Sequence, residues 1–366
     1  MYTNGSKIKR ILIISTVGLQ LDGITSVITS YLEAMNRSDM EIYVAGTINI
    51  QQSIQKRLEA MGCWVVNLPN RQIETFKYFF VLQKFIYTHQ IDVVHAHGNS
   101  ATLAIEMIAA WMGGCGKRIA HSHNTKSDHP KADKLLRPVF NLFYTDALTC
   151  GKDAGKWLFG MKPYTILRNG RDINRYNYDE TLRKKMRLRY GLTDQLAIGH
   201  VGGFVPQKNH EFAVAVYRKI LIMRPDAKLF FVGDGPLRAV MEATCSDVRE
   251  NIIFTGNMEC ISEFLQAMDG MILPSLFEGF PLVTIEWQIN GLPSILSASI
   301  TQECVLTDFT KQLSLERSAS EWASIIINMA EKQDRKENAL MGKKNICKSG
   351  YNISESTNIL RQIYLK

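Results

Sequence analysis

The sequence lacks the cysteine spacing that zinc sites and small disulfide-bonded proteins share. Seven cysteines are scattered through 366 residues, and no pair has the C-x-x-C spacing. A run of about 20 apolar residues, which a membrane-spanning helix needs, is also missing. The start of the chain leads into an apolar stretch too short for a secretion signal. We therefore expect a cytosolic protein without a metal framework.

Several catalytic signatures are absent as well. The sequence contains no H-E-x-x-H, no G-x-S-x-G and no D-x-D motif, and the last is usual in metal-dependent sugar transferases. The net charge of +8 is moderate, so it is compatible with binding to phosphates, with an anionic membrane surface or with solubility alone. No helix-turn-helix, zinc finger or RNP motif indicates nucleic acid as a partner.

What the sequence does contain is an alternation of short apolar runs with helical patterns. A length of 366 residues and 46% hydrophobic residues allow two domains with ample cores. In the first half the predicted strands are 10–15, 42–45, 64–67, 93–95 and 118–120, and the predicted helices are 24–35, 53–61, 76–89 and 101–112. This β-α order predicts a parallel sheet covered by helices on both faces.

The pattern restarts after a basic, less regular stretch at 168–190. The predicted strands are 197–202, 229–232, 252–254 and 270–273, and the predicted helices are 211–223, 237–244 and 261–268. We expect an α/β protein with two Rossmann-like domains facing a central cleft, where open α/β sheets bind ligands. The expected boundaries are 1–167 for the first domain, 168–348 for the second, and 349–366 for a C-terminal helix.

The most informative stretch runs from Pro274 to Pro293. It places Glu278 at the end of a predicted strand and Glu286 eight positions later, about two turns into a helix that follows a Gly-Phe-Pro turn. Free N–H groups at that helix start would suit a diphosphate, and the two carboxylates would suit sugar hydroxyls. The alternative is a capping glutamate followed by a solvated one.

Other loops of the second half also follow predicted strands. Adjacent glycines at Gly202 and Gly203 allow a ligand to approach the backbone, and Lys208 offers a charge for phosphate. The alternative is a lysine that faces water. The turn at Gly233 lacks the third glycine of a dinucleotide fingerprint, and the loop with Met258 could offer backbone groups to a base.

Two features of the first half are candidates for binding or proton transfer. The loop from Thr16 to Gly23 contains glycines but no phosphate-binding lysine motif. Paired histidines follow two predicted strands, at His95 with His97 and at His121 with His123. We expect the members of each pair to point to opposite faces of the sheet, which disfavours a shared metal. One histidine of each pair would face the cleft, and a structural role stays open for His95 and His121.

Together, the E-x7-E stretch, the Lys208 loop, the Gly-x-Gly-Pro turn and the Asn169-Gly170 hinge resemble one family. It is the retaining GT-B glycosyltransferases of the group-4 class, of the type that builds bacterial capsular and exopolysaccharides. The resemblance covers nearly the whole chain, and it implies that the last helix returns to the first domain. It also implies transfer of a hexose or N-acetylhexosamine from a nucleoside-diphosphate sugar, with UDP favoured, to a glycan or lipid-linked acceptor. Retention of configuration and the absence of a metal or other cofactor follow from the same resemblance.

The resemblance implies roles for individual residues. Glu278, Lys208 and His123 would be catalytic: Glu278 would hold the donor sugar and diphosphate, Lys208 would neutralise the leaving diphosphate, and His123 would face the transferred sugar. Glu286 would bind the ribose. The full implied set of donor-binding residues is Gly23, Gly203, Met258, Gly279, Phe280, Pro281, Leu282 and Glu286.

One residue departs from the family pattern. An arginine usually follows the glycine of the loop before the lysine, and here that place is Gly203. Loss of one charge-assisted donor costs on the order of 1.5–3 kcal/mol, unless Arg168 or Arg171 compensates. A catalytically silent relative that binds a partner transferase or a glycan is therefore one alternative. A nucleotide-sugar 2-epimerase of the same architecture is another.

A basic stretch in the first half is interleaved with apolar residues. Its members are Lys117, Arg118, Lys126, Lys131, Lys134 and Arg137, with Leu135, Leu136, Val139 and Phe140. It could seat the protein on an anionic membrane, at the inner face of the plasma membrane, near a lipid-linked acceptor. A solvated helix face is the equally open alternative.

Overall fold

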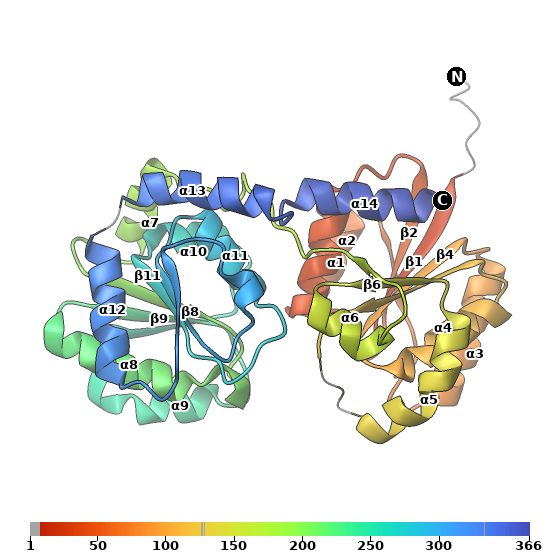
Figure 1. Ribbon diagram of the computed structural model, residues 1–366, viewed down its shortest axis with the longest axis horizontal. Helices are drawn as coiled ribbons and strands as arrows, with labels where there is room; N and C mark the ends of the chain where they lie inside the picture. Colours follow the sequence, from red (N-terminus) through yellow and green to blue (C-terminus); the bar gives the residue numbers. More distant parts are fainter. Residues whose placement is uncertain (1–7, 126, 128, 333) are drawn as a thin grey trace. The chain divides into compact units, whose positions relative to one another are not determined.

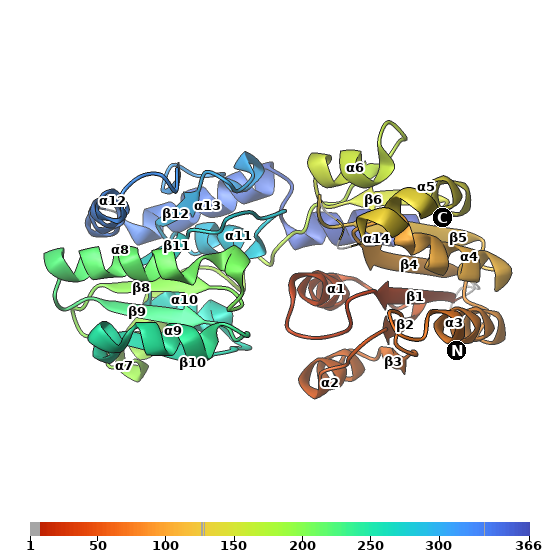
Figure 2. The same cartoon turned by 90° about the horizontal axis from the view of Figure 1, so that it is seen from below.

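The chain forms two compact units in the computed structural model, which describes residues 8–125, 127, 129–332 and 334–366 (Figure 1). Unit 1 comprises Met1–Gly170 and Ile353–Lys366, and unit 2 comprises Arg171–Asn352. Each unit contains one parallel sheet with helices packed against it, as Figure 2 also shows. The prediction of two Rossmann-like α/β domains is confirmed.

The sheet of unit 1 has seven strands in the order β3-β2-β1-β4-β5-β6-β7. Its strands are β1 Lys9–Ser15, β2 Met40–Gly46, β3 Trp64–Asn67, β4 Val93–Gly98, β5 Lys117–Ser122, β6 Asp146–Thr149 and β7 Thr165–Ile166. Its helices are α1 Gly23–Ala34, α2 Gln52–Ala60, α3 Thr75–Thr88, α4 Ala104–Met112, α5 Pro130–Phe143, α6 Lys152–Phe159 and α14 Ile353–Leu365. The interior strand β1 is buried from Ile11 to Ser15, and residues 11–14 are all apolar, because helices cover both faces of the sheet.

The sheet of unit 2 has six strands in the order β10-β9-β8-β11-β12-β13. Its strands are β8 Ala197–Val201, β9 Lys228–Val232, β10 Ile252–Gly256, β11 Gly270–Leu273, β12 Ser294–Ser297 and β13 Thr310–Leu313. Its helices are α7 Glu180–Arg189, α8 His210–Met223, α9 Arg238–Thr244, α10 Ile261–Ala267, α11 Leu282–Ile289, α12 Ala319–Glu331 and α13 Arg335–Lys348. Neighbouring β8 and β11 bring the loops that follow them to one edge of the sheet.

The stretch described as less regular in the sequence contains a helix. α7 begins after Asp179, whose carboxylate accepts a hydrogen bond from the N–H of Leu182 at 2.8 Å. Only Met186 of this helix is buried, so the chain carries little of the apolar periodicity that would have indicated a helix. The expectation of an irregular connection is wrong for these residues.

The last helix returns to unit 1, as the resemblance implied. α14 packs against α1 and β1, with Leu360 and Tyr364 buried. Arg361 forms a 2.5 Å ion pair with Asp39, and the ammonium group of Lys117 donates to the backbone oxygen of Ile363. None of the described helices is both long and apolar enough to cross a membrane.

Candidate functional site

The centre of the candidate site is an ion pair between two loops of unit 2. Lys208 ends the short helical turn Pro206–Lys208 after β8, and its Nζ lies 2.5 Å from Oε1 of Glu278 in the loop after β11. The hydroxyl of Ser275 donates to the same carboxylate oxygen at 2.9 Å. The two charged side chains are only 17% and 9% exposed. The alternative of a lysine that faces water is therefore excluded at Lys208.

Glycines create the space that the lysine occupies. A Cβ atom at Gly202 would lie 3.0 Å from both Cδ and Cε of Lys208, so the side chain lies directly against this backbone. Gly233 has a φ of +138°, and a Cβ there would lie 2.2 Å from the backbone oxygen of Gly202. Lys208 can lie against the loop after β8 only because Gly202 lacks a side chain. The loop after β9 can approach Gly202 only because Gly233 lacks one.

Three hydrogen bonds tie the lysine loop to the glutamate loop. The side chain of Asn209 donates to the oxygen of Pro274 at 3.1 Å, and the N–H of Leu276 donates to the oxygen of Gln207 at 2.8 Å. The side chain of Gln207 donates to the oxygen of Phe277 at 2.9 Å. Lys208 and Glu278 are thus held by a rigid frame.

Glu286 lies in the second turn of α11 and is 5% exposed. Its carboxylate accepts a hydrogen bond from Nε of Arg171 at 2.8 Å, and the hydroxyl of Tyr176 is a further partner. Burial raises the pKa of Glu286, while the charge of Arg171 opposes that rise. Arg171 is 2% exposed and engaged with Glu286, so its pairing differs from the compensating role for Gly203 that the sequence suggested.

The turn between the two glutamates ends at the start of α11. Pro281 precedes Leu282, the first helical residue, and no side chain caps this end of the helix. The ring of Phe280 stacks on Tyr351, with ring centroids 4.9 Å apart, which orients the turn. The hydroxyl of Thr284 donates back to the oxygen of Pro281 at 2.7 Å. A helix start that no side chain caps suits an anionic group.

Two further predicted positions lie in neighbouring loops. Met258 follows β10 and is half-buried in the core of unit 2. Gly203 follows β8, and a Cβ at this position would contact only the backbone oxygen of Asp234, at 3.4 Å. A side chain at position 203 is therefore sterically allowed, in contrast to Gly202.

Gly23 and His123 belong to unit 1. Gly23 is the first residue of α1, and no atom lies within 4 Å of the place where its Cβ would be. The carboxylate of Asp22 caps this helix by accepting from the N–H of Thr25 at 2.8 Å, and burial raises the pKa of Asp22. The open backbone at Gly23 is compatible with the close approach of a ligand.

Four histidines of unit 1, His95, His97, His121 and His123, form one cluster, and the prediction that each pair points to opposite faces is wrong. His95 and His97 on β4 have ring centroids 4.2 Å apart, as do His121 and His123 on and after β5. Residues two apart on a strand share a face, and the register places His97 beside His121. All four rings consequently meet at the carboxyl ends of two neighbouring strands.

Hydrogen bonds order this cluster into two pairs. Nδ1 of His97 lies 2.8 Å from Nε2 of His123, and Nε2 of His95 lies 3.1 Å from Nδ1 of His121. The other nitrogen of His95 contacts the hydroxyl of Tyr364 at 2.6 Å. Burial lowers the pKa of His95 and of His123 to about 3, so the rings are neutral at pH 7.

The same cluster could bring three imidazoles to one metal ion. Nitrogen atoms of His95, His97 and His121 lie within 4.8 Å of one another. A metal-binding histidine usually donates its second N–H to a partner, and Nε2 of His121 is buried without one. Two of the rings already use facing nitrogens to bond with each other, so the arrangement fits a hydrogen-bonded network better than a metal centre.

The basic stretch of the first half does not form one continuous surface among the described residues. Phe140 is fully buried, and the guanidinium group of Arg118 donates to the backbone oxygens of Phe143 and Cys115. Lys126 lies outside the described residues. Lys131 and Lys134 remain exposed on α5.

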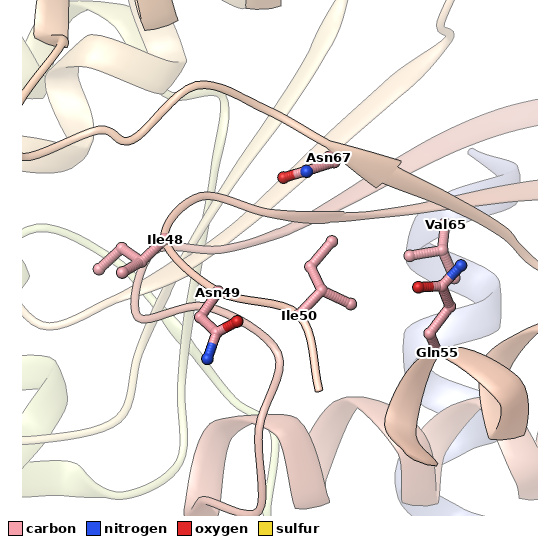
Figure 3. A pocket seen from close by; sticks show the side chains of 6 residues that line it. All are labelled: Ile48, Asn49, Ile50, Gln55, Val65 and Asn67. Carbon is pink, nitrogen blue, oxygen red and sulfur yellow. The ribbon is translucent and has the colours of Figure 1, made fainter. Parts of the chain in front are cut away.

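Unit 1 also contains a small pocket of about 240 Å³ (Figure 3). It is lined by Ile48, Asn49, Ile50, Gln55, Val65 and Asn67 near β3, at the edge of the unit 1 sheet. None of the predicted site residues lines it. No local sequence motif indicates Tyr176, Tyr364 or the pairing of Arg171 with Glu286, because each of these contacts spans a long sequence separation.

Comparison with known proteins identifies related sequences. Residues 195–332 match the family model described as "Glycosyl transferases group 1". A putative glycosyltransferase EpsF of Bacillus subtilis is 32% identical over 288 residues, which are 75% of this chain and 74% of the relative. An Escherichia coli UDP-Gal:alpha-D-GlcNAc-diphosphoundecaprenol alpha-1,3-galactosyltransferase is 25% identical over 315 residues, 80% of each chain.

Solved structures agree in fold. HepE from Anabaena, crystallised in complex with UDP-glucose, is similar with a TM-score of 0.77 at 17% sequence identity, over 96% of this chain and 98% of HepE. WaaG, a glycosyltransferase involved in lipopolysaccharide biosynthesis, gives a TM-score of 0.70 at 14% identity, over 95% and 99%. The predicted GT-B fold is confirmed.

Proposed function

We propose the substrates and the catalytic roles of this chain from its family: it belongs to the group 1 glycosyltransferases, which are the retaining hexosyltransferases introduced above as the group-4 class. It transfers a hexose or N-acetylhexosamine from a UDP-sugar to a glycan or polyprenyl-linked acceptor in the assembly of a surface polysaccharide. The reaction retains the anomeric configuration and needs no metal ion. The observation that carries this proposal is the partly buried Lys208–Glu278 pair beside the uncapped start of α11.

The names of two relatives support the choice of substrates. The Escherichia coli relative is named for a UDP-galactose donor and a diphosphoundecaprenol-linked acceptor. A 30% identical stretch of 177 residues is shared with the protein CapJ of Staphylococcus aureus, over 46% of this chain and 44% of CapJ. A UDP-sugar and a lipid-linked acceptor are therefore the first substrates to test.

Charge on the departing diphosphate is what the protein must stabilise. Lys208 supplies a positive charge, and the N–H groups at the start of α11 supply a partial positive charge in a place shielded from water. Without a nucleotide, Glu278 neutralises Lys208. On donor binding the diphosphate takes the ammonium group, and the Glu278 carboxylate becomes free to accept hydrogen bonds from sugar hydroxyls.

The remaining predicted residues complete the donor site. The backbone of Gly279, Phe280, Pro281 and Leu282 lines the diphosphate, and that of Met258 contacts the base. Glu286 binds the ribose through its carboxylate, which Arg171 and Tyr176 hold in place. In unit 1, Gly23 allows close approach of the diphosphate, and His123 faces the transferred sugar as a neutral hydrogen-bonding group.

Release of UDP from candidate sugar nucleotides in the presence of a polyprenyl-diphosphate-sugar acceptor tests this proposal. We expect Lys208→Ala and Glu278→Ala to lower kcat about 100- to 1,000-fold, because each removes charge stabilisation or sugar contacts within a shielded site. Lys219→Ala on α8 is the matched control, since that lysine is exposed. Unchanged turnover in Lys208→Ala would disprove the proposed role of the pair.

Gly203 supports a second candidate function. The family usually has an arginine at this place, and Arg171 is engaged with Glu286. A protein that binds the sugar nucleotide without turning it over, as a partner of another transferase, is compatible with this loss. UDP-sugar binding by calorimetry together with no UDP release on any acceptor would favour this second candidate.

A further inference from the structure

His97 and His123 form a hydrogen-bonded pair in which one ring is buried and the other is only half-buried. His97 is 1% exposed and lies in β4, an interior strand of the unit 1 sheet. His123 follows β5 and is half-buried. Only His123 therefore offers surface to a ligand, and His97 can act on a ligand only through His123.

The backbone around His97 belongs to the fixed part of the sheet. β4 pairs with β1 on one side and with β5 on the other. The N–H and the hydroxyl of Thr16 both donate to the backbone oxygen of His97, at 3.3 and 2.8 Å. His123 lies just beyond the last residue of β5. The 2.8 Å contact between Nδ1 of His97 and Nε2 of His123 thus ties the outer ring to a fixed inner one.

This hydrogen bond determines which nitrogen of His123 carries a proton. Burial lowers the pKa of both rings, so each is neutral at pH 7 and has a single N–H group. Within the described part of the chain, His123 is the one hydrogen-bond partner of the His97 ring. A proton on Nε2 of His97 would leave an N–H group without a protein acceptor in a ring that water barely reaches. The contacts therefore favour a proton on Nδ1 of His97.

We propose that His97 is a positioning residue, whose Nδ1–H group donates to Nε2 of His123 and so keeps the proton of His123 on Nδ1. The Nδ1–H group of His123 then donates a hydrogen bond to a hydroxyl oxygen of the transferred sugar. With the opposite arrangement of protons, the same nitrogen would be an acceptor. The inference rests on the proposed function in one respect, which is the contact of His123 with the sugar.

The other two histidines of the cluster provide a matched control. His95 and His121 are fully buried, and they bond to each other at 3.1 Å. His95 also contacts the hydroxyl of Tyr364 at 2.6 Å. No hydrogen bond joins either ring to His123 among the residues that the structure describes. His95→Leu therefore removes a buried, hydrogen-bonded imidazole but keeps the bond between His97 and His123.

Nitrogen NMR of the full chain with isotope-labelled histidine tests the pair without any substrate. The chemical shifts show which ring nitrogen carries the proton, and the signals of His123 are identified by their loss in His123→Gln. We expect a proton on Nδ1 of His123 in the wild-type chain and in His97→Asn, because an asparagine amide can donate from nearly the same place. In His97→Leu the proton should be found partly or wholly on Nε2. A wild-type His123 with its proton on Nε2 would overturn the proposal.

UDP release from UDP-galactose, UDP-glucose and their N-acetylamino forms tests the consequence for the reaction. His97→Leu should lower kcat/KM about tenfold, whereas His97→Asn should stay within about twofold of the wild-type chain. His95→Leu should lower the melting temperature about as much as His97→Leu but leave kcat/KM nearly unchanged. Equal losses of kcat/KM in the two leucine variants, or no recovery in His97→Asn, would overturn the positioning role. Absence of turnover by the wild-type chain would count against the proposed function alone, because the NMR measurement decides on the pair without a substrate.

Discussion

The two units place chemically different groups at the same position of the same architecture. In unit 2 the loops after β8 and β11 carry the ion pair Lys208–Glu278, and helix α11 contributes Glu286 to a second ion pair with Arg171. In unit 1 the ends of β4 and β5 carry imidazoles with lowered pKa values, bonded to one another and, through His95, to Tyr364. The sheet topology determines where functional side chains can lie close together, and the residues at the strand ends determine whether these side chains are charged.

The charged groups of unit 2 and the neutral imidazoles of unit 1 also contribute differently to stability. A buried ion pair depends on both partners, because removal of one leaves an uncompensated charge in a medium of low polarity. Neutral rings carry no such penalty at pH 7, but they acquire one as soon as the pH falls far enough to protonate them. We therefore expect unit 2 to be sensitive to loss of a partner and unit 1 to be sensitive to acid.

The largest expected effect comes from breaking the Arg171–Glu286 pair. Arg171→Met should reduce the free energy of unfolding by about 3–5 kcal/mol, because the Glu286 carboxylate is left buried and unpaired. Denaturant unfolding followed by tryptophan fluorescence, to which the buried Trp287 contributes, would measure this. Adding Glu286→Gln to the same chain should recover part of the loss.

An exposed pair of the same unit is the control for that experiment. Arg218 and Asp247 lie 2.8 Å apart with side chains 41% and 55% exposed. Arg218→Met should cost less than about 1 kcal/mol, since water solvates both groups. Similar losses in the two variants would mean that burial does not make unit 2 depend on its ion pairs.

The sequence was sufficient to predict the core strands but not these pairings. The strands 64–67 and 270–273 were predicted with the observed bounds, because apolar runs of that length have few alternatives in a parallel sheet. The Arg171–Glu286 contact joins residues 115 positions apart, so no local sequence pattern indicates it. The histidine cluster was mispredicted from the strand geometry itself, although alternate residues of a strand share a face. Lys208 and Glu278 were both singled out, whereas their direct contact was not foreseen.

A smaller effect per side chain is expected from acid, and it should distinguish unit 1 from unit 2. Burial lowers the pKa of His95 from 6.5 in the unfolded chain to about 3. The unfolded state then binds more protons than the folded state between these values, so the stabilisation is complete above pH 6.5 and is lost as the pH falls. Between pH 6.5 and 5 the loss is about 2 kcal/mol for one such histidine.

Burial lowers the pKa of four histidines in unit 1, and in unit 2 it lowers the pKa of His200 and His210. Hydrogen exchange at pH 7 and at pH 5 should therefore show protection in β4 and β5 falling more than protection in β11. His129→Ala, which removes an exposed ring, should leave the difference unchanged. Equal loss of protection in both sheets would contradict the proposed origin of acid sensitivity.

The smallest expected effect comes from a substitution that adds a positive charge to unit 2. Gly203→Arg places a guanidinium group beside Lys208, and a Cβ at this position meets only the Asp234 oxygen at an ordinary contact distance. If the missing arginine limits catalysis, kcat should rise about tenfold, which corresponds to one charge-assisted hydrogen bond to the leaving diphosphate. Gly202→Ala is the adjacent control and should lower kcat, because its Cβ would displace the Lys208 side chain. UDP release that stays at the wild-type rate in Gly203→Arg would show that the frame around Lys208 already supplies the charge that the reaction needs.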